Sequence, residues 1–272
     1  MQRLVTGLLG AALATLALAL PGPSRADSDS PVIARIVESG KLRVGMSGTQ
    51  PPLNFKSKSG EMMGLEVDLA RALAIMMGVD LHIVQKPFAE LLGALQKGEV
   101  DLVMSGMTIT PARNMKVAFV GPYLLSGKSI LTRSATLAKA DQSDDLDDPK
   151  LTVAALAGST SEDFVKAFAP KAKLVATPDY DAAVKLVLEG KADALVADYE
   201  ACALQALLHP RDGLITLDSP LTVEPIGVAV APGDPLFLNL IQNSLAALEA
   251  ALLFEGLKGR WIQGGLWLDQ LP

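Results

Sequence analysis

One short segment of this sequence has the residue types and the spacing needed to bind a small anion. The segment SGMTITPAR places Gly106 and the hydroxyls of Ser105, Thr108 and Thr110 ahead of Arg113. A guanidinium holds a carboxylate through two parallel hydrogen bonds, which a lysine ammonium does not reproduce. The segment therefore predicts a carboxylate site. The alternative is a surface arginine paired with a nearby acid.

Two further segments carry related chemistry. Ser159 and Thr160 lead into a predicted helix, whose first turn offers unpaired N–H groups and a partial positive charge to an anion. Ser159 with Glu162 also fits a capping box, which needs no ligand. Asp198 directly follows a predicted strand, so it is placed either to meet an ammonium group or to cap the helix that begins at Tyr199.

The elements that must position these segments alternate between strand-like and helix-like patterns. This alternation is typical of an α/β fold with a largely parallel sheet. A first block has expected strands at 41–46, 81–84 and 100–104 and helices at 65–76 and 88–96. A second block has expected strands at 151–155, 173–176 and 194–197 and helices at 161–169 and 180–189. Ligands of such sheets bind beyond the C-terminal ends of the strands, where all three polar segments lie.

The two blocks share a weak repeat that predicts two lobes built on one plan. Gly98-Glu99-Val100-Asp101 and Gly190-Lys191-Ala192-Asp193 each combine a helix stop with an aspartate and the start of a strand. A strand at 226–230 and a long apolar helix at 236–253 follow the second block.

The order of these elements predicts that the chain crosses between the lobes near 129–133 and again near 221–226. We therefore expect lobe 1 to comprise residues 27–130 plus 225–272, and lobe 2 to comprise residues 131–224. The aspartate-rich stretch 138–150 should be a solvated loop between the blocks.

The N-terminus has the pattern of a secretory signal. Arg3 precedes an apolar run at 4–20, and Ser24-Arg25-Ala26 offers small residues at the positions that a signal peptidase reads. We expect residues 1–26 to be a signal peptide cleaved after Ala26, although the run is close to the length of a membrane anchor.

Composition narrows the partners of the exported chain. Without Arg3 and Arg25, 22 of the 24 basic residues remain against 30 acidic ones, a net charge of −8, which disfavours nucleic acid and anionic membranes. Cys202 is the single cysteine, so no internal disulfide is possible. We expect no metal and no cofactor.

With these residues in view, the chain resembles the polar amino acid solute-binding family of ABC importers. The resemblance spans residues 40–268. It rests on the ordered motifs GLEVDLARALA, LQKGEVDLVMSGMTITPARNMKVAFVGPY, AGSTSE, VLEGKADALVAD, PIGVAV and GLKGRW. It implies a bilobed type II periplasmic-binding-protein fold, with two α/β lobes joined by a two-segment hinge that closes on the ligand. It also implies a periplasmic monomer that delivers a small carboxylate, an amino acid or a derivative, to an inner-membrane ABC permease.

The resemblance assigns roles to individual residues. Arg113, Thr108 and Thr160 match the positions that bind an α-carboxylate, and Asp198 matches the one that binds an α-ammonium. Ser105, Gly106 and Ser159 belong to the same loops. The site so expected comprises Gln50, Leu65, Phe88, Ser105, Gly106, Thr108, Arg113, Ser159, Thr160 and Asp198.

The chain departs from the family where aromatic side chains usually enclose the ligand. Those places read Gln50, Pro52-Leu53 and Gly64-Leu65. Without an aromatic face, cation stacking is lost, so ligands resembling arginine or lysine lose support. An unusual or more apolar ligand becomes plausible, and its lining would be formed by residues that can equally be plain core: Met62, Met63, Leu65 and Phe88.

Two other functions compete with transport. Some cyclohexadienyl dehydratases resemble the same family, and their prephenate or arogenate chemistry needs a placed acid or base, for which Glu66, Glu162 and Asp198 are the candidates. The third possibility is a binding protein recruited to carry an apolar ligand.

Overall fold

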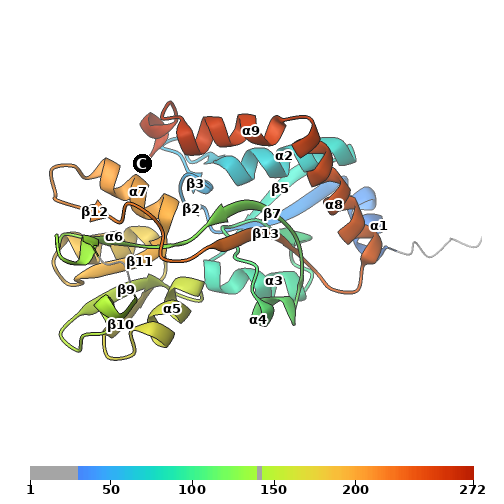
Figure 1. The fold of residues 1–272 in the computed structure, drawn as a ribbon. Coiled ribbons are helices and arrows are strands. Elements are labelled where there is room, and N and C mark those ends of the chain that lie inside the picture. Colours follow the sequence, from blue (N-terminus) through green and yellow to red (C-terminus); the bar gives the residue numbers. More distant parts are fainter. Residues whose placement is uncertain (1–29, 140–142) are drawn as a thin grey trace, which may run out of the picture.

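The computed structural model describes residues 30–139 and 143–272, so the expected signal peptide lies outside it. Two lobes lie side by side, and each is built on a five-stranded sheet within these residues (Figure 1). The lobe 1 sheet has the order β5-β1-β6-β13-β7, with bounds Asp80–Gln85, Lys41–Met46, Leu102–Val103, Glu224–Val230 and Ala118–Ser126. The lobe 2 sheet has the order β10-β9-β11-β8-β12, with bounds Lys173–Thr177, Thr152–Leu156, Ala194–Asp198, Lys128–Thr132 and Ile215–Thr216.

The two sheets follow one plan, which confirms the predicted α/β fold. Each begins with three parallel strands, and its fourth strand is antiparallel to the third. The helices cover these sheets: α1 Pro31–Ser39, α2 Leu65–Met77, α3 Leu91–Gln96, α4 Pro111–Asn114, α5 Thr160–Phe168, α6 Tyr180–Leu188, α7 Tyr199–Leu208, α8 Pro235–Ala250 and α9 Leu253–Lys258. A small sheet of β2 Thr49–Gln50, β3 Asn54–Lys56 and β4 Met62–Met63 precedes α2.

The repeat seen in the sequence has a structural cause. Gly98 and Gly190 both adopt a left-handed conformation (φ +69° and +66°) where a helix ends. In lobe 1 the Asp101 carboxylate accepts the backbone N–H of Arg43 (2.8 Å), and in lobe 2 Asp193 accepts that of Thr152 (2.7 Å). Asp101 thus ties β1 to the turn before β6, and Asp193 ties β9 to the turn before β11.

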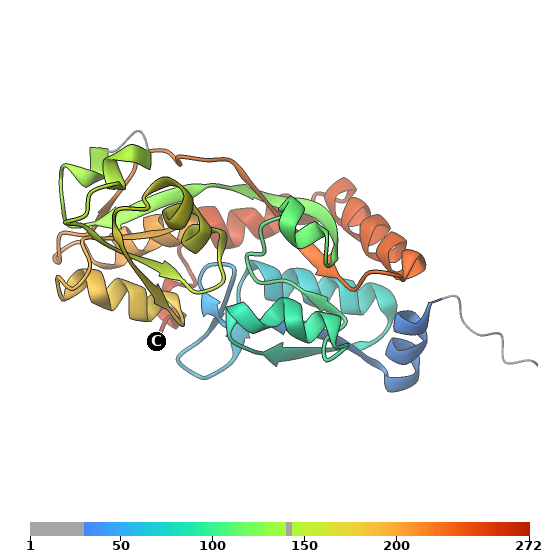
Figure 2. The ribbon, with the colours of Figure 1, turned by 90° about the horizontal axis from the view of Figure 1, so that it is seen from below.

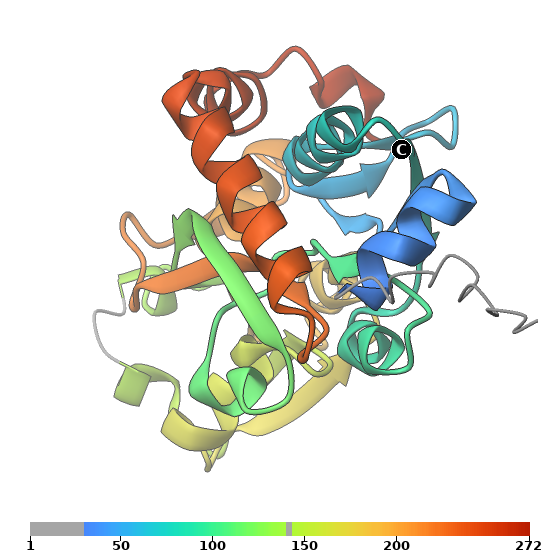
Figure 3. The same cartoon turned by 90° about the vertical axis from the view of Figure 1, so that its right-hand side faces the viewer.

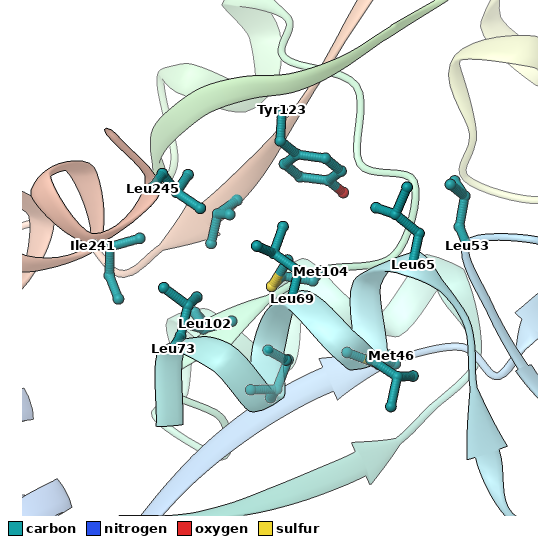
Figure 4. Packing of buried hydrophobic residues seen from close by; sticks show 14 of the residues in the cluster. Met46, Leu53, Leu65, Leu69, Leu73, Leu102, Met104, Tyr123, Ile241 and Leu245 are labelled. Atoms are coloured by element: carbon teal, nitrogen blue, oxygen red, sulfur yellow. The ribbon is translucent and has the colours of Figure 1, made fainter. Parts of the chain in front are cut away.

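The core of lobe 1 lies between its sheet and the helices α2, α8 and α9. Leu65, Leu69 and Leu73 follow one face of α2 and are fully buried (Figure 4). Helix α8 runs across this lobe and adds Ile241 and Leu245 to the same cluster (Figures 3 and 4). Burial of this apolar stripe accounts for the 3.6-residue period that predicted the helix.

Three expected elements differ in detail. The helix expected at 236–253 breaks at Leu252, whose φ of +56° cannot continue a helix, so α8 and α9 are separate. The strand expected at 100–104 is only two residues long, because the chain turns toward the loop beyond it. In the stretch 138–150, Leu146 is fully buried, so its described part is not a purely solvated loop.

The lobes are joined by two extended crossings (Figure 2). The first occurs at Gly127, between β7 in lobe 1 and β8 in lobe 2, and is therefore earlier than the expected crossing at 129–133. A continuous β-type sequence does not reveal where a strand changes sheets. A Cβ on Gly127 would lie 1.9 Å from the carbonyl oxygen of Thr222 in the second crossing, so the two crossings pack directly against each other.

In the described ranges, no single helix is long and apolar enough to span a bilayer. One pair meets that test of length and composition together, but it is bent by 78°: Pro235–Ala250 with Leu253–Gln263.

Candidate functional site

The three polar segments of the sequence meet between the lobes. The loop after β6 carries Thr108, the loop after β9 leads into α5 at Thr160, and β11 ends at Asp198. The hydroxyl oxygens of Thr108 and Thr160, which come from opposite lobes, lie 3.2 Å apart. Parallel strands present their C-terminal ends at one edge, which explains why segments distant in sequence converge here.

A carboxylate of the protein itself lies on these two hydroxyls. Glu224, the first residue of β13, accepts hydrogen bonds at Oε2 from Thr108 (3.0 Å) and Thr160 (2.9 Å). The Lys128 Nζ lies 2.8 Å from the same oxygen. One carboxylate oxygen therefore joins both lobes and a buried ammonium.

Lys128 also pairs with the acid that the sequence singled out. Its ammonium lies 2.6 Å from Asp198 Oδ1, and its side chain is only 1% exposed. Burial alone would lower the pKa of the Lys128 ammonium, but attraction to Asp198 and Glu224 outweighs it and raises that pKa. Asp198 occupies the N-cap position of α7 but makes no side-chain capping hydrogen bond, so its carboxylate serves the lysine instead.

Arg113 reaches across the gap between the lobes. Its guanidinium donates to the backbone carbonyl of Thr108 (3.0 Å) in lobe 1 and to that of Gly158 (3.1 Å) in lobe 2. It lies 5.8 Å from the centroid of the Phe88 ring, within cation–π range. Burial lowers the pKa of the guanidinium, although the acids Asp163, Asp198 and Glu224 oppose that shift.

The start of α5 has the Ser159 half of the predicted capping box, while the Glu162 carboxylate accepts from the residue before the N-cap instead of from Ser159 itself. The Ser159 hydroxyl accepts from the N–H of Glu162 (3.2 Å) and donates to the carbonyl of Leu156 (2.6 Å). The Glu162 carboxylate reaches back to the N–H of Gly158 (2.6 Å) and forward to Lys166 (2.6 Å). Ser159 therefore shapes the helix start, while its neighbour Thr160 supplies the hydroxyl that reaches the gap between the lobes.

A buried polar network supports the loop at Ser105 and Gly106. The Ser105 hydroxyl bonds Gln50 Oε1 (2.9 Å), and the Gly106 N–H donates to Glu66 Oε1 (2.7 Å). Tyr123 also donates its hydroxyl to Glu66, and Asn54 donates an amide N–H to the other carboxylate oxygen (2.6 Å). Burial raises the pKa of the fully buried Glu66, although its three donors oppose the shift. The Glu66 carboxylate therefore holds the backbone of this loop at Gly106 and is itself completely buried.

The positions without the family's aromatics lie in or beside the core of lobe 1. Leu65 is fully buried and packs in the α2 cluster, while Gln50 and Leu53 lie close to Gly106. Between the lobes at this point lies a cavity of only about 10 Å³. Its lining comprises Gln50, Pro51, Pro52, Leu53, Tyr180, Asp198, Glu200 and Ala201. A cavity of about 330 Å³ beside α7 and Trp261 shares Pro52 and Glu200 with this lining, and one of about 460 Å³ lies elsewhere, beside β7 and α8.

The sequence reasoning missed Lys128 and Glu224. The signal was present, because Lys128 is a lone charge in the otherwise uncharged stretch LLSGKSILT and Glu224 directly precedes PIGVAV. A charged residue inside a buried strand needs a partner. No pattern in the sequence, however, names that partner. In the described parts of the chain, no group of three or more His, Cys, Asp and Glu side chains could hold a metal ion.

Comparison with known proteins identifies the family. The family model of the bacterial extracellular solute-binding proteins, family 3, matches residues 42–264. The chain belongs to this family. It is 29% identical to the cyclohexadienyl dehydratase of Pseudomonas aeruginosa over 93% of both chains.

Two solved structures are also similar to this chain. One is an ancestral amino acid-binding protein described as a precursor of cyclohexadienyl dehydratase; it has a TM-score of 0.79 and 37% identity over 85% of this chain and 99% of that one. The other, described as a candidate binding component of an ABC transporter of Wolinella succinogenes in complex with lysine, has a TM-score of 0.80 and 36% identity over the same shares. The resemblance and the bilobed fold expected from the motifs are therefore confirmed.

Proposed function

We propose that the protein is a periplasmic solute-binding protein that captures a small carboxylate ligand, an amino acid or a derivative, between its lobes for an ABC importer. The observation that carries this proposal is the pair of hydroxyls from opposite lobes, Thr108 and Thr160, which bind one carboxylate together. Such a seat is complete only when the lobes are closed, so a ligand carboxylate bound there stabilises the closed form.

Arg113 completes the proposed carboxylate clamp. Its guanidinium spans from the carbonyl of Thr108 to that of Gly158, and its N–H donors would turn from these carbonyls to the ligand carboxylate. Asp198 lies beside the seat as the proposed partner of a ligand ammonium. Ser105, Gly106, Gln50 and Ser159 would act by shaping the loops, and Phe88 by supporting Arg113.

Calorimetry with a panel of amino acids and their derivatives tests the proposal. Arg113→Ala should keep the fold but weaken binding by about 30- to 1,000-fold, or roughly 2 to 4 kcal/mol, as for other buried charge-assisted pairs. Arg133→Ala, at an exposed arginine of lobe 2, is the matched control and should leave the affinity unchanged. Unchanged affinity in Arg113→Ala would refute the carboxylate assignment.

A dehydratase activity is the second candidate, because the similarity to the Pseudomonas aeruginosa enzyme covers nearly the whole chain. Of the three acids expected for such chemistry, Glu66 is enclosed in lobe 1, Glu162 is engaged in the α5 cap, and Asp198 is paired with Lys128. Incubation with prephenate and arogenate, followed by ultraviolet spectroscopy of the aromatic product, distinguishes an enzyme from a binding protein.

A further inference from the structure

The ion pair of Lys128 and Glu224 has the charges of an amino acid head group. Its ammonium and carboxylate lie 2.8 Å apart. The ammonium contacts Asp198, and the carboxylate contacts the hydroxyls of Thr108 and Thr160. These are the groups to which the proposed function assigns the two ends of a zwitterionic ligand.

We propose that this pair is a built-in occupant of the head-group site, with Glu224 on the seat of the ligand carboxylate and Lys128 on the seat of the ammonium. The inference rests on the proposed function for the identity of those seats. It adds that a ligand binds by exchange with the protein's own side chains.

Hydrogen-bond capacity makes the exchange obligatory at the carboxylate end. A threonine hydroxyl has one proton to donate, and the protons of both Thr108 and Thr160 are directed at Glu224 Oε2. A second carboxylate on these hydroxyls would find neither hydroxyl proton free and would contact the like charge of Glu224. A ligand carboxylate and Glu224 therefore exclude each other from this seat.

The balance of charge indicates that a ligand ammonium must likewise displace Lys128. Lys128, Arg113, Asp198 and Glu224 together carry no net charge, and Lys128 is almost completely removed from water. A ligand ammonium at Asp198 must compete with the buried Lys128 ammonium, which lies 2.6 Å from Asp198 Oδ1. A carboxylate ligand without an ammonium needs to displace Glu224 alone and can keep Lys128 as a second cation beside Arg113.

The position of the pair in the chain links this exchange to lobe closure. Lys128 is the first residue of β8, directly after the crossing at Gly127, and Glu224 is the first residue of β13, directly after the return crossing. By holding Thr108 of one lobe and Thr160 of the other, Glu224 keeps the lobes together without a ligand. Loss of its carboxylate should therefore open the protein.

Small-angle X-ray scattering of the purified protein, refolded from denaturant to remove co-purified ligand, tests this inference. Glu224→Ala should have a larger radius of gyration than the wild type. Glu224→Gln, which keeps the shape but loses the charge, should show the same direction of change. Glu189→Ala is the control, because Glu189 forms an exposed ion pair with Lys191 on the surface of lobe 2. Thermal unfolding of each variant verifies that it is folded.

Acetate supplies the missing carboxylate and makes the test specific. At roughly millimolar to tens of millimolar concentrations, typical of so small a ligand, acetate should restore the compact form of Glu224→Ala. Chloride at equal ionic strength should not restore it, and neither should acetate once Thr160→Val is added. The wild type should not respond.

The possible results separate this inference from the proposed function. If both Glu224 variants are as compact as the wild type, or if acetate leaves an opened Glu224→Ala unchanged, the built-in occupant is refuted. If acetate closes Glu224→Ala but no amino acid or derivative binds the wild type or the variant, the occupant stands and the proposed transport function fails.

Discussion

Replacing Lys128 by Met is the sharpest test of how the buried charges stabilise the protein. The substitution keeps the length of the side chain but leaves Asp198 and Glu224 facing each other without a cation. Removal of one partner from a buried ion pair typically costs about 3 to 5 kcal/mol. Since the side chains of Asp198 and Glu224 remain 13% and 14% exposed, water can reach them in part, and we expect a loss near 3 kcal/mol.

For a chain of this size, that loss lowers the melting temperature by roughly 6 to 12 °C. Urea unfolding followed by circular dichroism measures the free energy, and differential scanning calorimetry measures the melting temperature. Lys86→Met is the matched control, because Lys86 pairs with Glu99 at a similar 2.7 Å but the two side chains are 27% and 42% exposed. We expect no measurable change in that variant.

A further variant separates charge from packing. Lys128→Met combined with Asp198→Asn and Glu224→Gln removes the lysine together with both of its carboxylate partners and leaves Arg113 as the remaining charge of the four, so it should recover part of the lost stability. Equal stability of Lys128→Met and Lys86→Met would show that the reasoning from burial is wrong. A triple variant as unstable as Lys128→Met would show that packing of the lysine stem, and not its charge, stabilises the site.

Three other predictions follow from single groups. Burial raises the pKa of Glu66 in the folded state, so its contribution to stability is complete below its unfolded pKa and is lost as the pH rises through the folded value. The loss of stability in Glu66→Gln should therefore be largest in acid and shrink with rising pH when measured by urea titration. A loss that grows with pH would contradict this reasoning. Gly127→Ala would bring a Cβ within 1.9 Å of the Thr222 carbonyl and should destabilise the protein by about 1 to 3 kcal/mol, whereas Gly93→Ala, which meets nothing within 4 Å, should be neutral or stabilising in the same assay. Burial raises the pKa of the Cys202 thiol to about 12, so it should resist alkylation by iodoacetamide at pH 8 until the protein is unfolded, and rapid labelling of the native chain would refute this.

Much of the fold could be predicted from the sequence because its signals are local. The apolar face of α2, the glycine that ends it and the aspartates at 101 and 193 each reflect contacts within one lobe. The break at Leu252 and the crossing at Gly127 were missed, since neither changes the apolar pattern around it. Helix ends and strand exchanges depend on what packs nearby, which periodicity does not record.

The residues of the candidate site likewise fall into those that the sequence predicted and those that it missed. Thr108, Arg113, Thr160 and Asp198 were predicted as site residues because their loops follow buried strands and their motifs resemble a family, and the structure brings them together between the lobes. The Ser159 N-cap could also be predicted, since the N–H that it accepts lies three residues away. The network under Gly106 was not, because it joins Glu66 and Tyr123 from separate elements.

The sequence by itself determined the family, the α/β architecture and the three polar loops that we propose as the carboxylate site. Only the tertiary structure decided what lies on those loops. Lys128 and Glu224 begin two strands that are far apart in the chain, and they meet because both crossings between the lobes pass through the same place. Burial then makes their pairing with Asp198, Thr108 and Thr160 obligatory, because a charge removed from water must be neutralised and hydrogen-bonded by whatever surrounds it.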